Sequence, residues 1–323
     1  NSGTEANEAA IKLAKYYTKR HNVIAFFGAF HGRSMGSLSL TASKTTHRRG
    51  FGPLIPGIYH APYPDPYRRP PQHSPESWGA ESLRFIEEQL FVHVVAPDEV
   101  AAVMVEPIQG EGGYIVPPDS FLQGLREITR RHGILLVTDE VQSGMGRSGR
   151  MFAIEHAGVE PDIVTMAKGI ASGLPLGVAT ARAEIMSWPP GTHASTFGGN
   201  PVACAAALTT LDLLRESLMK NAETVGAYMM DGLRALMDKH ALIGDVRGRG
   251  LMIGVELVRD RQTKERATKE RNAIVQECFR HGMLVLGAGR NTIRFSPPLV
   301  LTKEQADTAV KIFDDALISI GSS

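Results

Sequence analysis

The sequence has almost no cysteine, no long hydrophobic run and no excess of charge of either sign. Its 323 residues include two cysteines, Cys204 and Cys278, whose spacing fits neither a disulfide scaffold nor a metal site. A reducing, cytoplasmic setting is therefore expected. No apolar run approaches the ~18–20 residues of a membrane-spanning helix, so we expect no membrane segment. The net charge of +1 gives no support for a nucleic-acid partner.

The composition is that of a globular protein, with 43% hydrophobic and 21% charged residues. The length suits two domains, and we place a large domain at residues 1–224 and a smaller C-terminal domain at residues 225–323. The chain has no initiator methionine, and residues 1–5 are typical of a loop that enters a helix. We therefore expect that the N-terminal part of the parent protein is missing.

Short apolar runs alternate with helical patterns over the first two thirds of the chain. This alternation predicts an α/β fold whose mostly parallel sheet is covered by helices on both faces. Strands are expected at residues 22–27, 101–107, 133–140, 162–168 and 177–181, and helices at residues 3–19, 82–91 and 119–132. Residues 62–75 are rich in proline and predict a surface loop.

The last third of the chain predicts a mixed α+β unit. A helical pattern runs from residue 200 to about residue 240, with a polar break near residues 217–221. Further strands are expected at residues 247–257, near 283–286 and at 292–300, and further helices at residues 265–281 and 303–320.

Lys168 stands at the expected C-terminal end of a strand and is the only lysine between Lys44 and Lys220. Ligands of α/β sheets bind at that edge. A lysine that is partly buried there loses affinity for its proton, because desolvation disfavours the ammonium form. The resulting neutral amine can form a Schiff base with an aldehyde cofactor. The alternative interpretation is a lysine that reaches water from a strand end.

Asp139 ends another apolar run. Taken alone, it is more simply a helix cap or a strand-end carboxylate. Beside a Schiff-base lysine it could hold the proton on the ring nitrogen of pyridoxal phosphate, which withdraws electrons only while that nitrogen is protonated. Strand alternation puts Asp139 and Val141 on one face, so Val141 could press on the ring and Gln142 could reach its phenolic oxygen.

Two loops of small residues could bind a phosphate. Ser2, Gly3 and Thr4 lead into a helix, and the N-terminus of a helix offers free N–H groups and a positive dipole end to an anion. The second loop is HASTFGGNP at residues 193–201, where Thr196 could donate its hydroxyl group. Most such loops are only helix caps, so neither decides the function.

Seven motifs occur in order along the chain. They are NSGTEANEAA (1–10), FHGRS (30–34), VEPIQGEGG (105–113), TDEVQSGMGRSG (138–149), AKGIASGLPLG (167–177), STFGGNP (195–201) and RGRGLMIGVE (247–256). In this combination the chain resembles the class III aminotransferases, and among them the 4-aminobutyrate aminotransferase group, from its first residue nearly to its last. The resemblance implies a pyridoxal-phosphate enzyme of fold type I, a homodimer with active sites at the subunit interface.

The resemblance also implies the roles of individual residues. Lys168 would hold the cofactor, Val141 and Phe30 would lie on opposite faces of its ring, and Thr196 would reach the phosphate in the partner subunit. The residues expected at the cofactor are Gly3, Thr4, Phe30, His31, Glu106, Asp139, Val141, Gln142, Lys168 and Thr196, with Lys168 and Asp139 catalytic.

Three further residues are expected at the substrate. Arg33 would hold its distal carboxylate, and Glu111 would pair with Arg294 and act as a gate. The gate would neutralise Arg294 for an ω-amino acid and free it for glutamate.

The expected reaction moves an amino group from an ω-amino acid, such as 4-aminobutyrate, to a keto acid, with 2-oxoglutarate as acceptor. An amino-acid racemase or epimerase on the same scaffold, and an acetylornithine or ornithine aminotransferase, remain alternatives. A degenerate scaffolding protein is disfavoured by the intact set of Lys168, Asp139 and Gln142.

Overall fold

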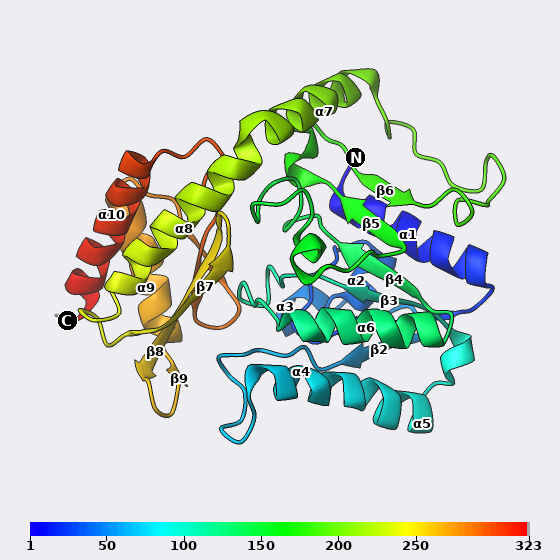
Figure 1. Cartoon of the computed structure of the whole chain (residues 1–323), viewed down its shortest axis with the longest axis horizontal. Helices are drawn as coiled ribbons and strands as arrows, with labels where there is room; N and C mark the ends of the chain where they lie inside the picture. The colour runs from blue at the N-terminus through cyan, green and yellow to red at the C-terminus, as the bar shows by residue number, and fades with distance from the viewer. Residues whose placement is uncertain (322–323) are drawn as a thin grey trace.

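The computed structural model describes residues 1–321, and its larger sheet occupies the first part of the chain (Figure 1). Six strands follow the order β2-β1-β3-β4-β5-β6. Neighbours from β2 to β5 run parallel, while β6 runs antiparallel to β5. The strands are β1 (Asn22–Phe26), β2 (Ile58–Ala61), β3 (Val100–Val105), β4 (Leu135–Asp139), β5 (Ile163–Met166) and β6 (Val178–Ala181). The expected α/β class with a mostly parallel sheet is confirmed.

Helices cover both faces of this sheet, as the apolar runs predicted. Val23 and Ala25 of β1 pack in one core with α1, whereas Ile24 and Phe26 pack in another core with α6. Figure 1 shows α1 and α6 on opposite sides of the strands. The helices of this part are α1 (Gly3–Thr18), α2 (Met35–Leu40), α3 (Thr45–Arg48), α4 (Pro75–Arg84), α5 (Phe91–His93) and α6 (Asp119–Arg131), with a π-helical turn at Phe85–Leu90 between α4 and α5.

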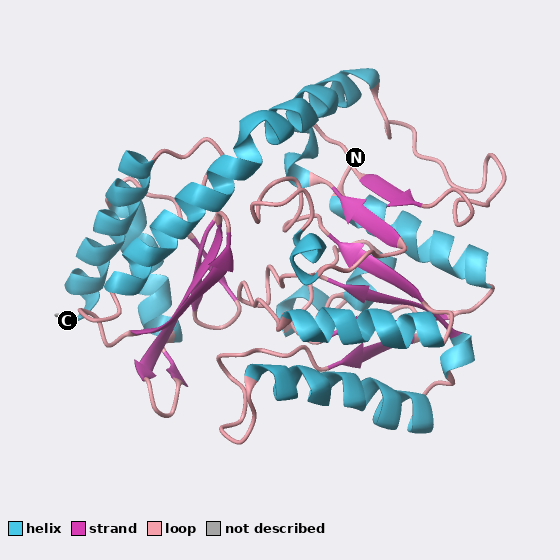
Figure 2. Cartoon of the chain, viewed as in Figure 1, coloured by secondary structure: helices cyan, strands magenta, loops and turns pink. Residues whose placement is uncertain are grey.

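A second, antiparallel sheet lies in the C-terminal part, in the order β10-β11-β8-β7, with β9 paired to β8. Three helices bury its apolar face, and their contacts form a separate core. Figure 2 shows these helices on the side of this sheet that faces away from the larger sheet. The elements are α8 (Met219–Ala235), β7 (Ile243–Arg249), β8 (Met252–Asp260), β9 (Glu265–Arg266), α9 (Thr268–Arg280), β10 (Leu286–Ala288), β11 (Thr292–Phe295) and α10 (Lys303–Gly321).

One continuous helical path joins the two parts. Helix α7 (Pro201–Leu213) passes into a π-helical turn at Leu214–Leu218 and then into α8 (Figure 1). The polar break expected near residues 217–221 is wrong, because the helical path continues through the π-helical turn and into α8 without ending. The domain boundary between residues 224 and 225, which falls inside α8, stays a prediction.

The proline-rich stretch at residues 62–75 is more than a surface loop. Its first half, residues 62–70, is buried or half-buried. Arg68 forms an ion pair with Glu256 of β8 at 2.5 Å, so this stretch ties the two parts together. Within residues 1–321, no helix is long and apolar enough to cross a bilayer, and no group of histidine, cysteine and acidic side chains could hold a metal ion.

Candidate active site

Four parallel strands of the larger sheet end at one edge, where they face a common cavity. Its volume is about 460 Å³, and it lies outside the carboxyl ends of β1, β3, β4 and β5, where ligands of such sheets bind. Every expected site residue except Thr196 lines it. These residues are Gly3, Thr4, Phe30, His31, Arg33, Glu106, Glu111, Asp139, Val141, Gln142, Lys168 and Arg294.

Lys168 begins a 3₁₀ turn just after β5 and projects into the cavity. Its φ is 50°, a left-handed conformation that costs a non-glycine residue roughly 1–2 kcal/mol. Within residues 1–321, the Lys168 amine donates no hydrogen bond and forms no ion pair. The residue is open to solvent through the cavity, yet protein atoms surround its amine. This burial lowers the pKa of Lys168, although the charges of Asp139 and Glu106 act in the opposite direction.

Asp139, at the end of β4, is a buried carboxylate with three hydrogen-bond donors. Its Oδ2 accepts hydrogen bonds from Asn7 Nδ2 and lies 2.8 Å from His31 Nδ1, and its Oδ1 accepts one from the Val141 backbone N–H. Such bonds stabilise an anion that would otherwise be costly to bury. Burial lowers the pKa of His31, but the hydrogen bond and charge of Asp139 outweigh this effect and the pKa is raised overall.

Glu106 is a second buried carboxyl group beside this pair, and it is 5% exposed. It accepts hydrogen bonds from the backbone N–H groups of Phe30 and Gly110, at 2.8 and 2.9 Å. Burial raises the pKa of Glu106 to about 7; the charge of His31 opposes this rise and that of Asp139 adds to it. The cavity wall therefore holds a buried carboxyl group, Glu106, whose raised pKa favours its protonated form.

Asn7 is a site residue that the sequence reasoning missed. Its side-chain amide donates hydrogen bonds to Asp139 and to the backbone oxygen of His31, and its Oδ1 accepts one from Thr165. The signal was present, because Asn7 is a polar residue within the buried stripe of α1, one turn after Thr4.

The N-terminus of α1 opens onto the cavity. The Ser2 hydroxyl caps it by accepting a hydrogen bond from the Glu5 backbone N–H. A Cβ at position 3 would lie 2.6 Å from Val141 Cγ1, so only glycine lets the helix start this close to the end of β4. The Thr4 hydroxyl lies 2.6 Å from that of Ser34. Free N–H groups at such a helix end suit an anion.

Phe30, Val141 and Gln142 form walls of the cavity. The Phe30 ring contacts the edge of His47, with centroids 5.2 Å apart, and the guanidinium carbon of Arg33 lies 5.8 Å from its centre. Gln142 is held in place because its Nε2 donates to the Tyr114 hydroxyl at 2.8 Å.

Glu111, Arg294 and Lys44 form a charged group on another wall. Glu111 Oε1 lies 2.6 Å from Arg294 Nη1, and its Oε2 lies 3.0 Å from Lys44 Nζ. Burial raises the pKa of Glu111, but the two cations outweigh it and the pKa is lowered overall. The expected Glu111–Arg294 contact is therefore present, whereas its gating role stays a prediction. Lys44 was not expected here.

Thr196 lies apart from this cavity, on an exposed loop between β6 and α7. A single chain cannot bring it to its own cavity in this arrangement. Its expected contact with the cofactor of a partner subunit stays a prediction.

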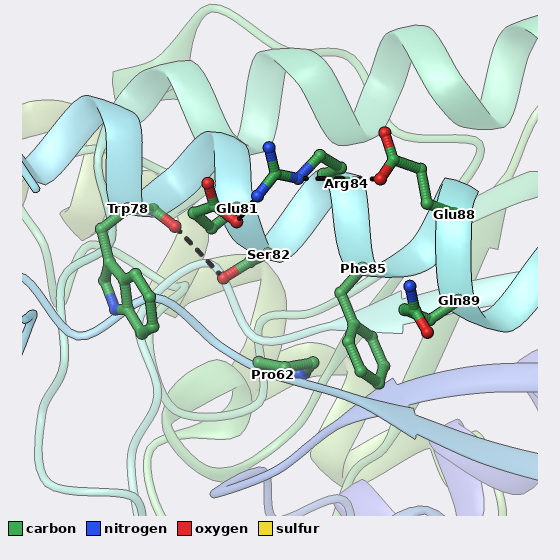
Figure 3. A pocket seen from close by; sticks show the side chains of 8 residues that line it. All are labelled: Pro62, Trp78, Glu81, Ser82, Arg84, Phe85, Glu88 and Gln89. Atoms are coloured by element: carbon green, nitrogen blue, oxygen red, sulfur yellow. Dashed lines mark hydrogen bonds and ion pairs between the residues drawn. The ribbon is translucent and has the colours of Figure 1, made fainter.

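A different hollow of about 310 Å³ lies beside α4 (Figure 3). Trp78, Phe85 and Pro62 line it, and its charged groups are already paired, Arg84 with Glu81 and Glu88. None of the expected site residues belongs to it, so it has no part in the candidate site.

Comparison with known proteins decides the family. The family model for aminotransferase class-III matches residues 1–317. The chain belongs to this family. Membership confirms the expected resemblance, makes pyridoxal phosphate the cofactor and makes the protein an enzyme of the aminotransferase type.

Relatives of this class-III chain carry more than one activity. A leucine/methionine racemase of Thermococcus litoralis is 43% identical over 321 residues, covering 99% of this chain and 72% of that protein. A 4-aminobutyrate aminotransferase of Mycobacterium leprae is 43% identical over 316 residues, covering 94% and 69%. An amine transaminase from an uncultivated Pseudomonas species, solved with bound pyridoxal phosphate, has a TM-score of 0.93 at 36% identity, covering 99% of this chain and 76% of that one.

The residues of the cavity fit pyridoxal phosphate. The Lys168 amine, which has no hydrogen-bond partner within residues 1–321, suits the aldehyde, and the carboxylate of Asp139 suits the ring nitrogen. The N-terminus of α1 suits the phosphate. His31 also keeps a buried ring nitrogen, Nε2, that has no hydrogen-bond partner within residues 1–321.

We expect Lys168 to carry the cofactor covalently. Borohydride reduction of the loaded protein, followed by peptide mapping, should place a pyridoxyl label on Lys168, because its buried amine has a lowered pKa. Lys44, the other lysine near the cavity, is held by Glu111 and should stay unlabelled. A label on Lys44, or none on Lys168, would contradict this assignment.

The pKa of His31 should lie above its ordinary value of 6.5 in the cofactor-free protein, because Asp139 stabilises the imidazolium. In Asp139→Asn that charge is lost, while burial and the opposing charge of Glu106 remain, so the pKa should fall from its native value. Histidine NMR titration measures both values. A native His31 that titrates below 6.5 would show that the contact does not outweigh burial.

Proposed function

We propose that this class-III enzyme transfers the amino group of an ω-amino acid such as 4-aminobutyrate to 2-oxoglutarate. One observation carries the proposal: Lys168 shares its cavity with two arginines, Arg33 and Arg294, and within residues 1–321 only Arg294 is paired with a carboxylate, that of Glu111. Such a site can accept one carboxylate at Arg33 for every substrate and a second at Arg294 for some substrates only.

Lys168 is the group that moves the proton. Pyridoxal phosphate, when bound, supplies an aldehyde for the amino group and a cationic ring that withdraws electrons. The Lys168 amine, whose pKa is lowered by burial, can take a proton from the substrate carbon that bears the amino group. It can then return this proton to a different carbon. Asp139 keeps the ring nitrogen protonated, and Asn7 and His31 hold Asp139 in place.

Arg33 fixes the far end of the substrate. Its guanidinium lies over the Phe30 ring and lines the cavity. A planar guanidinium binds a carboxylate in a bidentate manner, which sets the distance from carboxylate to amino group. A substrate with a distal carboxylate is therefore held with its amino end at Lys168.

Glu111 lets one cavity serve two substrates. An ω-amino acid brings no α-carboxylate, so Glu111 stays on Arg294 and compensates its charge. Glutamate brings an α-carboxylate that takes the place of Glu111. Lys44 Nζ already lies 3.0 Å from the second carboxylate oxygen of Glu111. It can therefore remain paired with Glu111 when Glu111 leaves Arg294.

A second copy of the chain completes the enzyme in this proposal, with Thr196 at the partner's phosphate. An exposed apolar surface beside that loop supports it. Phe197 is 74% exposed, and on α7 Val202 and Leu208 are 68% and 65% exposed. Apolar side chains gathered in this way mark a surface that another protein covers.

Racemisation is the second candidate function, because two relatives that cover nearly all of this chain, at 43% and 42% identity, are a leucine/methionine racemase and an alanine/serine racemase. It needs an acid on the side of the substrate opposite Lys168.

Substitution of Glu111 should separate the two half-reactions. In Glu111→Gln, the single-turnover reaction with 4-aminobutyrate should slow roughly tenfold, because Arg294 is left uncompensated. The reaction with glutamate should change little, since its own carboxylate pairs with Arg294. The exposed Glu88→Gln is the control. Equal losses of rate with both substrates would contradict a gating role for Glu111. A faster reaction with ornithine or acetylornithine than with 4-aminobutyrate would contradict the proposed amino donor.

Racemisation is tested by incubating the loaded enzyme with one enantiomer of leucine or alanine and no keto acid. We expect no inversion on chiral chromatography, and amino transfer only after 2-oxoglutarate is added. Inversion without a keto acid would favour the racemase over our proposal.

A further inference from the structure

The loop that carries Glu111 is held on one side by the larger part of the chain, where Gln109 Nε2 donates to the Phe27 carbonyl oxygen and the Gly110 backbone N–H donates to Glu106. The loop spans residues 109–114 and is closed by a single bridge between Gln109 and Ile115. Gly113 has a φ of 131° and Tyr114 a φ of 53°, so the turn needs an uncommon backbone conformation at both positions. Its position must therefore be fixed by something outside the loop.

Arg247, on β7 of the C-terminal sheet, holds this loop by its backbone. Its Nε donates to the carbonyl oxygens of Gly113 and Tyr114, both at 3.1 Å, and its Nη2 donates to Gly113 O at 2.6 Å. One guanidinium thus binds two consecutive carbonyls, which a compact ammonium could not do with the same geometry.

The other side of Arg247 is anchored in its own sheet. Nη1 donates to Glu256 at 2.7 Å and to Asp245 at 2.9 Å, and Nη2 also donates to the Thr292 hydroxyl at 3.2 Å. All five N–H groups of the guanidinium therefore have acceptors, and the side chain is only 11% exposed. A group held in this way has one orientation.

Close packing presses the loop against the same sheet. The Gly289 backbone N–H donates to the carbonyl oxygen of Glu111 at 2.8 Å. A Cβ at position 254 of β8 would lie 2.9 Å from Tyr114 Cβ, so glycine is needed where the loop crosses the strand. The loop therefore contacts the C-terminal sheet at Gly289 and Gly254 as well as at Arg247.

Arg294 belongs to that same sheet. It lies two residues after Thr292 on β11, so both side chains point to one face of the strand. Arg247 therefore fixes the Glu111 loop to the sheet that carries Arg294. It thereby determines the distance between the side chains of Glu111 and Arg294.

We propose that Arg247 is a positioning residue that holds the Glu111 loop against the C-terminal sheet and so keeps Glu111 on Arg294. The loop also places Tyr114, which accepts the hydrogen bond from Gln142. The effect on substrate choice rests on the function proposed above, whereas the anchoring of the loop does not.

Arg68 provides a matched control. It also forms an ion pair with Glu256 and is partly buried, but its remaining hydrogen bond goes to the Lys264 carbonyl and not to the Glu111 loop. Arg247→Lys and Arg68→Lys both keep a positive charge beside Glu256 and both lose the planar fork. Only the first change should release the loop.

Hydrogen–deuterium exchange of the cofactor-free protein tests the anchoring. The amides of Gly110, Gly113 and Tyr114 are hydrogen-bonded in the native loop. They should exchange about tenfold faster in Arg247→Lys and at the native rate in Arg68→Lys. Unchanged exchange in Arg247→Lys, or equal acceleration in both variants, overturns the proposal.

Half-reactions of the loaded enzyme test the consequence for Glu111. Arg247→Lys should slow the 4-aminobutyrate reaction about tenfold and the glutamate reaction much less. On a Glu111→Gln background the same change should cost nothing more, because its effect passes through Glu111. Equal slowing of both reactions that persists on that background overturns the proposal.

Two further points keep the test decisive. If Arg247→Lys does not fold, Thr292→Val removes one acceptor that orients Arg247, and about threefold faster loop exchange is expected while an unchanged rate overturns the proposal. If Glu111→Gln alone slows both half-reactions equally, the gate is lost, yet loop exchange still decides whether Arg247 is the anchor.

Discussion

The buried carboxylate of Asp139 is the constraint around which the site is built. An anion inside a protein must be hydrogen-bonded, and its three donors come from α1, from the segment after β1 and from the end of β4. These three segments must therefore meet at one edge of the sheet. The hydrogen bond from Asn7 to Asp139 also turns the start of α1 toward the cavity. One buried charge therefore positions both the group expected at the ring nitrogen and the helix end expected at the phosphate.

The parts of this arrangement that follow local rules could be read from the sequence. Lys168 and Asp139 were found because each ends an apolar run, and ends of parallel strands meet at one edge. The direction of β6, antiparallel to β5, could not be found in this way, because an apolar run carries no direction. The break expected near residues 217–221 is absent, because polar residues can lie on the exposed face of a continuous helix.

Contacts between distant segments could not be predicted. Asn7 and Asp139 are 132 residues apart, Lys44 and Glu111 are 67 apart, and Arg247 and Gly113 are 134 apart. Each contact depends on how helices and sheets pack, which no local pattern encodes. The pairing of Glu111 with Arg294 was expected only through family resemblance. Thr196 would act across a subunit boundary, which one chain cannot define.

The cavity draws on nearly the whole chain, from Gly3 at the start of α1 to Arg294 on β11. During translation, a ribosome-bound chain lacks one wall of the cavity until β11 has left the exit tunnel. The wall that carries Arg294 is therefore the last part of the cavity to be synthesised, whereas the residues expected at the cofactor, apart from Thr196, all lie within residues 3–168.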